Sequence, residues 1–276
     1  MNPNDPLRPP VEGSGEMPGP YNPYANPGQQ NPYPRGPAPT GPKLSLNVIG
    51  EAVDIISKHW KQVALAGAVM TVPFLVLLVG SYVYYFGVVF SAGPQADQFS
   101  PQMIFAQIVV YAASFLGYAL MAVGSVGAAK IAIQHRRGGP VTNELATAGF
   151  RVFGRATGFG LAQYIVYMAG VFCCVLPGLL FAGLTGAGVA VFAQDEEATI
   201  GDAFSRSWVA MKPHMWMALL LYFLVYMLSG LGSLACLVGI IFTQPLLPIA
   251  MTLAYLDVKH GPGQSDGLPP FPTSQG

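Results

Sequence analysis

The chain has 276 residues, of which 52% are hydrophobic and only 9% are charged, and its formal net charge is zero. Because an ordinary soluble domain carries about 25% charged residues, this composition argues against a soluble protein. Four long runs contain no Asp, Glu, Lys or Arg, and they are 62–90, 102–129, 156–194 and 213–256. About 20 apolar residues cross a bilayer, so the first two runs hold one span each and the last two hold two each.

The first 42 residues contain 13 of the 25 prolines and almost no aliphatic side chains. Such a segment cannot bury enough apolar surface to fold, so residues 1–42 are predicted to be a disordered tail, and residues 261–276 a second one. Residues 1–42 have no apolar core region, so they are not expected to be a signal peptide. Asn-Pro-Tyr occurs twice, and Tyr21, Tyr24 and Tyr33 are candidate groups for docking a cytoplasmic protein partner in an aromatic groove. The alternative is a plain flexible arm.

The segment that follows Leu44 has a helical pattern with two faces. Polar residues on one face include an Asp54–Lys58 pair at i,i+4 spacing. The opposite, apolar face is formed by Val48, Ile49, Ala52, Ile55, Ile56 and Trp60. An amphipathic helix on the membrane surface is expected here, with Trp60 at the interface.

The first hairpin follows this surface helix. Residues 62–90 are expected to cross the membrane, with Pro73 removing one helical hydrogen bond, and residues 102–133 are expected to return.

The same order then recurs twice. Thr142–Arg155 is expected to be a second amphipathic helix, followed by spans at 156–174 and 178–194 with a turn at Leu176-Pro177-Gly178. A third amphipathic helix is expected to begin at Thr199, with a cap-like Thr-x-x-Asp and an Asp202–Arg206 pair. Its hairpin is expected at 213–231 and 239–257, joined by a Gly-rich turn from Ser229 to Gly239. The fold class predicted for residues 43–260 is therefore an all-α, polytopic bundle of about six transmembrane helices, with three hairpins each preceded by a surface helix.

The positive charges give an orientation. With six spans, all 13 Lys and Arg residues fall on the side of the two termini. The three opposite loops contain none, and short loops obey the positive-inside rule. Both termini are therefore predicted to be cytoplasmic, in a multi-pass protein of the bacterial inner membrane.

The spans carry no ionisable side chain of the kind that proton relays and ion pathways need. Their neutral polar residues either hydrogen-bond between helices or mark a path for a ligand. These are Thr71, Gln107, Ser114, Ser125, Gln163, Thr185, Thr243 and Gln244. The four histidines lie at helix ends without metal-ligand spacing. Since no catalytic motif or basic stripe is present either, we expect no enzyme activity, no cofactor, no metal and no nucleic-acid partner.

Prolines single out the last span. Pro245 and Pro248 are expected to break its helix beside Gln244, and broken membrane helices are where transporters bind ligands. Thr243, Gln244 and Pro245 are therefore the candidate polar site inside the membrane. Small residues at Gly178, Ala182, Gly186 and Ala190 predict close helix packing.

The three cysteines lie toward the ends of the spans opposite the termini. Cys236 either forms a disulfide with Cys173 or Cys174, or all three are free thiols that fill the bundle.

Several of these segments resemble a known family. Asp202-Ala203-Phe204-Ser205-Arg206-Ser207-Trp208, Leu176-Pro177-Gly178, and Thr243-Gln244-Pro245-Leu246 through Tyr255-Leu256-Asp257 are similar to segments of a group of bacterial six-helix integral membrane proteins. That group includes the membrane domain attached to some glycerophosphodiester phosphodiesterases and many proteins of unknown function. The resemblance implies the six-helix fold over roughly residues 44–260. It implies no phosphodiesterase activity, because this chain has no such domain.

Two functions are compatible with these features. One is a non-enzymatic membrane scaffold or adaptor that recruits a cytoplasmic partner through its tail and packs laterally into homo- or hetero-oligomers. The other is a permease or conduit for a neutral or lipidic molecule, which uses the broken sixth helix. A conduit requires a continuous polar-lined cavity, whereas a scaffold can be packed solid, so the cavity discriminates between them.

Overall fold

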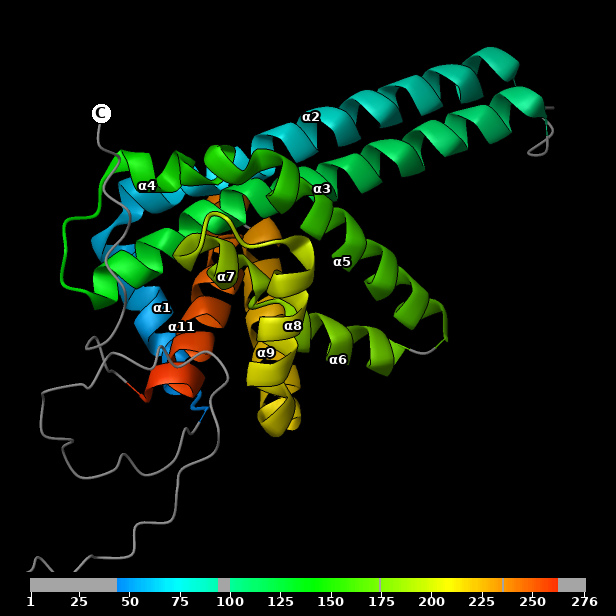
Figure 1. Cartoon of the computed structure of the whole chain (residues 1–276). Helices are drawn as coiled ribbons and strands as arrows, with labels where there is room; N and C mark the ends of the chain where they lie inside the picture. The colour runs from blue at the N-terminus through cyan, green and yellow to red at the C-terminus, as the bar shows by residue number, and fades with distance from the viewer. Residues whose placement is uncertain (1–43, 94–99, 174, 235, 263–276) are drawn as a thin grey trace, which may run out of the picture. The chain divides into compact units, whose positions relative to one another are not determined.

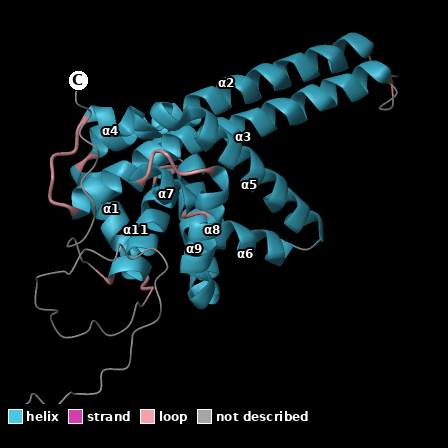
Figure 2. Cartoon of the chain, viewed as in Figure 1, coloured by secondary structure: helices cyan, strands magenta, loops and turns pink. Residues whose placement is uncertain are grey.

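The computed structural model describes residues 44–93, 100–173, 175–234 and 236–262, and this part of the chain is helical, without strands (Figure 2). Six of its helical segments are long and apolar enough to cross a membrane. They are Trp60–Ala92, Pro101–Arg136, Asn143–Cys173, Val175–Gln194, Ile200–Gly232 and Gly239–His260. The prediction of an all-α, multi-pass membrane bundle is confirmed. The tail tyrosines Tyr21, Tyr24 and Tyr33 lie outside the described residues, so the docking hypothesis stays a prediction.

The first repeat follows the predicted pattern. Helix α1 (Asn47–Lys58) buries Val48, Ala52 and Ile55, and Lys58 Nζ lies 2.8 Å from Asp54 Oδ2 on the exposed face. Helix α2 (Trp60–Ala92) runs without interruption through Pro73, and α3 (Pro101–Arg136) returns beside it. Figure 1 shows α2 and α3 as a long antiparallel hairpin.

The surface segment of the second repeat differs from the expectation. Thr142–Arg155 was expected to be one amphipathic helix, but the chain forms a short α4 (Asn143–Thr147) and a 3₁₀ helix η1 (Ala148–Val152). The cause is contact with α3, because a Cβ atom at Gly149 would lie 1.8 Å from the Val123 carbonyl oxygen. Backbone packing at this distance overrides local amphipathic preference.

The turn of the second hairpin was also misplaced. Helix α5 (Phe153–Cys173) is followed by α6 (Val175–Thr185), so Leu176-Pro177-Gly178 lies in the first turn of a helix. Proline is tolerated there because the first N–H groups of a helix have no partner within it. Gly178 serves packing instead, since a Cβ atom at Gly170 would lie 2.6 Å from its Cα.

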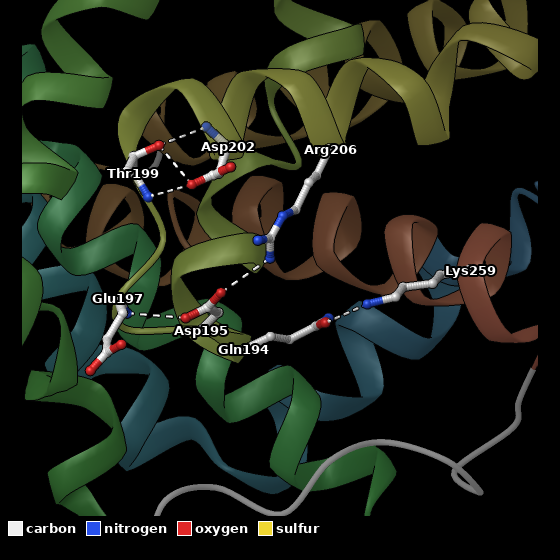
Figure 3. A network of polar contacts seen from close by, with 7 residues as sticks. All are labelled: Gln194, Asp195, Glu197, Thr199, Asp202, Arg206 and Lys259. Carbon is white, nitrogen blue, oxygen red and sulfur yellow. Dashed lines mark hydrogen bonds and ion pairs between the residues drawn. The ribbon is translucent and has the colours of Figure 1, made fainter. Parts of the chain in front are cut away.

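The third repeat begins with the predicted cap. The Thr199 side chain accepts a hydrogen bond from the Asp202 amide, and the Asp202 carboxylate accepts from the Thr199 amide, at the start of α8 (Ile200–Met211) (Figure 3). The expected Asp202–Arg206 pair is wrong, because Arg206 Nη1 instead lies 3.1 Å from Asp195 Oδ2.

A 3₁₀ turn, η2 (Lys212–His214), leads into α9 (Met215–Leu234). Residues from Ser229 to Leu234 therefore continue a helix where a Gly-rich turn was expected. Helices α10 (Cys236–Thr243) and α11 (Leu246–His260) complete the hairpin.

The return spans of the second and third hairpins are both broken near their middle. Helix α6 ends at Thr185 and α7 (Gly188–Gln194) continues, while α10 and α11 are separated at Gln244-Pro245, as the prolines predict. The first break is stabilised by Ser207 of α8, whose Oγ donates to the Leu184 carbonyl at 2.8 Å. No proline marks that break.

The spanning helices form a closed ring in which α2, α3, α5, α6, α9 and α10 each contact the next, and α10 contacts α2 again. Every one of these six contacts has a glycine at which a Cβ atom would lie within 3.1 Å of the neighbouring helix. They are Gly67, Gly117, Gly160, Gly170, Gly183 and Gly232. Small residues let helix backbones approach closely in lipid, so glycine contacts hold the ring together.

The ends of the helices that carry the Lys, Arg, Asp and Glu side chains, such as Lys130, Arg136, Glu196 and Asp257, are here called the charged end. Packed side chains fill this end of the ring. Helices α7 and α11 contact α3 and each other there. Their fully buried side chains include Ile131, Ile133, Phe192, Met251 and Leu253. These side chains pack α3, α7 and α11 together at this end.

Candidate ligand cavity

A cavity of about 610 Å³ lies inside the ring, lined by residues from all six of its helices. Small-molecule sites typically measure about 300–1,000 Å³, so the volume suits one small ligand or the head of a lipid. None of the lining residues is Asp, Glu, Lys, Arg or His. The cavity wall therefore carries no charged side chain.

Neutral polar side chains face this cavity from several helices. Four of the polar residues singled out in the sequence line it: Thr71, Ser125, Gln163 and Gln244. The Gln163 amide donates to Thr185 Oγ1 at 3.4 Å, which leaves its carbonyl oxygen for another contact. Residues more than 170 positions apart in sequence thus converge on one space.

Tyrosines form the second component of the wall, and the sequence analysis missed them. Tyr118 and Tyr164 stack with their ring centroids 4.7 Å apart, and the Phe74 ring meets Tyr118 edge-on at 5.4 Å. Tyr222 and Tyr226 stack one helical turn apart on α9. Their i,i+4 spacing is a sequence signal for a shared helix face, but it does not indicate whether that face meets lipid or a cavity.

The three candidate site residues have different roles. Gln244 lines the cavity. Thr243 instead joins α9 to α10, because its Oγ1 donates to the Ser229 carbonyl at 3.0 Å while Ser229 Oγ donates to the Thr243 carbonyl at 3.0 Å. Pro245 is buried and packs against Gly67 of α2, outside the cavity wall. Only one of the three therefore faces the cavity.

Thr71 differs from most other hydroxyl side chains of the spans. Its side chain is 1% exposed, and its Oγ1 has no hydrogen-bond partner among the described residues. Elsewhere in the spans a hydroxyl normally donates to the carbonyl four residues earlier, as Ser114, Ser125 and Thr185 do. A buried polar group without a partner costs about 1–3 kcal/mol, so a hydrogen bond from the Thr71 hydroxyl to a bound molecule would be favourable.

Ion pairs bind the three repeats together at the charged end. Arg136 of α3 donates from Nε and Nη2 to the two carboxylate oxygens of Glu51, each at 2.7 Å, and from Nη1 to Asp257 Oδ1 at 2.6 Å. Lys130, also on α3, pairs with Glu196. The α3 helix is thus linked to α1, to α11 and to the segment before α8.

A second polar network borders this end, in the segment between α7 and α8. Figure 3 shows Lys259 of α11 donating to Gln194 at 3.2 Å and Arg206 of α8 reaching Asp195. These contacts tie the third repeat to the end of the second.

Two of the histidines contact each other at the charged end. His59 Nε2 and His135 Nδ1 lie 3.1 Å apart, and burial together with the His135 ring lowers the pKa of His59 below its usual value. Within the described residues, no three His, Cys, Asp or Glu side chains gather in a way that could hold a metal ion. Cys173 is an exposed free thiol, whereas Cys174 and the Cys236 side chain lie outside the described residues, so the disulfide hypothesis stays open.

Comparison with known proteins adds no relative, since no protein-family model, curated protein or solved structure matches the chain. The resemblance to six-helix bacterial membrane proteins therefore stays a prediction.

Proposed function

We propose that the protein is a membrane conduit that takes an uncharged, lipid-soluble molecule into the ring between its three hairpins. The observation that carries this proposal is the uncharged cavity of about 610 Å³ within the six helices, whose mostly apolar wall includes neutral hydroxyl and amide side chains. A packed scaffold needs no such space. The two broken helices support the proposal, because Gly186 and Gln244 lie at the breaks and both line the cavity.

The chemistry of the wall agrees with an uncharged cargo and a non-enzymatic role. Proton relays and ion pathways in membranes are marked by Asp, Glu, Lys, Arg or His at depth, and the cavity wall carries none of these. Catalysis would require an acid, a base or a metal ligand at the same depth. What the wall offers is hydrogen bonding from hydroxyl and amide groups and apolar contact.

Orientation and location belong to the same proposal. The charged ends of the helices would face the cytoplasm of a bacterial cell, with both termini on that side and the charge-free ends facing outward. A partner for the tail and a lateral oligomer are compatible with a conduit, but no feature of the described residues favours either of them.

Transfer measured in liposomes tests the proposal. Protein would be reconstituted into vesicles that contain an acyl-labelled fluorescent glucosyl lipid or its phosphatidylglycerol counterpart, and dithionite would then quench the accessible label. Faster transfer of the uncharged lipid is expected with the protein present. Replacing Met121 and Leu247, which line the cavity, with Trp should abolish that transfer.

The control is Leu116→Trp, on the exposed face of α3, which should not slow transfer. Equal rates for the two lipids, or transfer that persists when the cavity is filled, would contradict the proposal.

A further inference from the structure

We infer that the cavity's guest is a lipid whose head group is an uncharged ring bearing oxygen atoms, and that Thr71 donates a hydrogen bond to that ring. This inference rests on the proposed function and names the ligand class of the same cavity. The ring could come from a quinone or from a sugar, since both present oxygen acceptors on an uncharged ring.

The absence of charge in the wall restricts the head group. Moving an ionised group out of water into an uncharged cavity is costly without an opposite charge, and no Asp, Glu, Lys, Arg or His lines this one. Hydroxyl and amide side chains do line it, at Thr71, Ser125, Gln163 and Gln244. Phosphate and ammonium head groups are therefore disfavoured, while carbonyl, ether and hydroxyl oxygens find donors.

The aromatic wall favours a ring over a chain of polar atoms. Flat rings gain from stacked and edge contacts with aromatic side chains. Phe74 follows Thr71 by three residues, so both lie on one face of α2, and the Phe74 ring touches the Tyr118 ring that stacks on Tyr164. A ring that accepts a hydrogen bond from Thr71 would therefore lie next to these aromatic side chains.

The rest of the wall suits the tail of a lipid. Leu75, Met121, Leu231 and Ile240 line the cavity together with these polar and aromatic side chains. Such a largely apolar wall suits a lipid better than a compact soluble molecule.

The Thr71 hydroxyl identifies the recognising group. It lines the cavity, is buried and has no partner among the described residues. Thr252 of α11 provides the matched control, because its Oγ1 is equally buried and partnerless but lies outside the cavity wall. Removing either hydroxyl as Thr→Val should leave the ligand-free protein as stable as before or more stable. Only the Thr71 change should affect binding.

Equilibrium binding in phosphatidylcholine nanodiscs tests this inference with three probes of one chain length: a decyl benzoquinone, decyl glucoside and decyl sulfate. We expect the quinone or the glucoside to bind saturably, which also identifies the source of the ring, and decyl sulfate not to compete. Thr71→Val should weaken binding of that probe about five-fold, the effect of one neutral hydrogen bond, while Thr252→Val should not.

Unchanged affinity in Thr71→Val, or competition by decyl sulfate, would overturn the inference. A lower melting temperature of ligand-free Thr71→Val would do so too, because it would reveal a structural partner. Transfer of uncharged lipid without ring selectivity would leave the proposed function intact and refute only the ligand class. If filling the cavity with Trp leaves transfer unchanged, the proposed function itself fails.

Discussion

Replacing Arg136 with Leu should destabilise the protein by about 3–5 kcal/mol, the usual cost of breaking a buried ion pair by removing one partner. The Arg136 side chain is 5% exposed and that of Asp257 4%, so the pair is shielded from water. Glu51, which takes two hydrogen bonds from the same guanidinium, is 31% exposed and would recover part of its solvation. The loss should therefore come mainly from the buried Arg136–Asp257 contact.

The assay is reversible unfolding in mixed micelles, with Lys58→Gln as the matched control. Lys58 pairs with Asp54 at a similar distance, but its side chain is 59% exposed, and exposed pairs contribute about 0–1 kcal/mol. Asp257→Asn should fall between the two, because it keeps the shape of the side chain and removes its charge. Equal destabilisation by Arg136→Leu and Lys58→Gln would refute the argument that burial makes this cluster important.

Three further outcomes follow from the fold. Gly67→Ala should destabilise the ring by about 1–3 kcal/mol, because its Cβ atom would lie 1.9 Å from a carbonyl oxygen of α10. Gly80→Ala should not, because nothing lies within 4 Å of its Cβ position. Equal unfolding curves for the two variants would disprove the tight contact. Burial and a neighbouring imidazole lower the pKa of His59 below 6.5, so its contribution to the free energy of unfolding should be fully present above pH 6.5 and decline as the pH falls below it. His59→Gln should remove that decline. A pH profile of stability that is unchanged by the substitution would refute this role. Reporter fusions should place Gly138 in the cytoplasm and Pro177 outside, and a periplasmic signal at Gly138 would overturn the six-span topology.

The fold could be predicted largely because lipid imposes a simple rule on composition. Charge-free runs of sufficient length identify the spans, and the amphipathic segment before Trp60 identifies the first surface helix. The Thr199 cap and the break at Pro245 were also predictable, since both depend on local chemistry within a few residues. The form of the second surface segment could not be predicted, because it is determined by backbone contact between Gly149 and α3.

The cavity could not be derived in the same way. Gln163 follows Thr71 by 92 residues and Gln244 follows Gln163 by 81, and the three meet only when the ring of helices closes. Gln244 was singled out as a candidate site because a proline follows it. Thr71 was only one of eight neutral polar residues of the spans, and the tyrosines were not singled out. The break at Gly186 has no proline to mark it and depends on Ser207 from another helix. Such features depend on tertiary contacts.

Photo-crosslinking tests the central claim most directly. A photoreactive residue placed at Gln163, which lines the cavity, would be compared with one at Val79, which is 57% exposed on the outer face of α2. After illumination in native membranes, the captured lipids would be identified by mass spectrometry. We predict that Gln163 captures an uncharged, ring-headed lipid, while Val79 captures phospholipids in proportion to their abundance. Capture of the same phospholipid mixture at both positions would contradict the account.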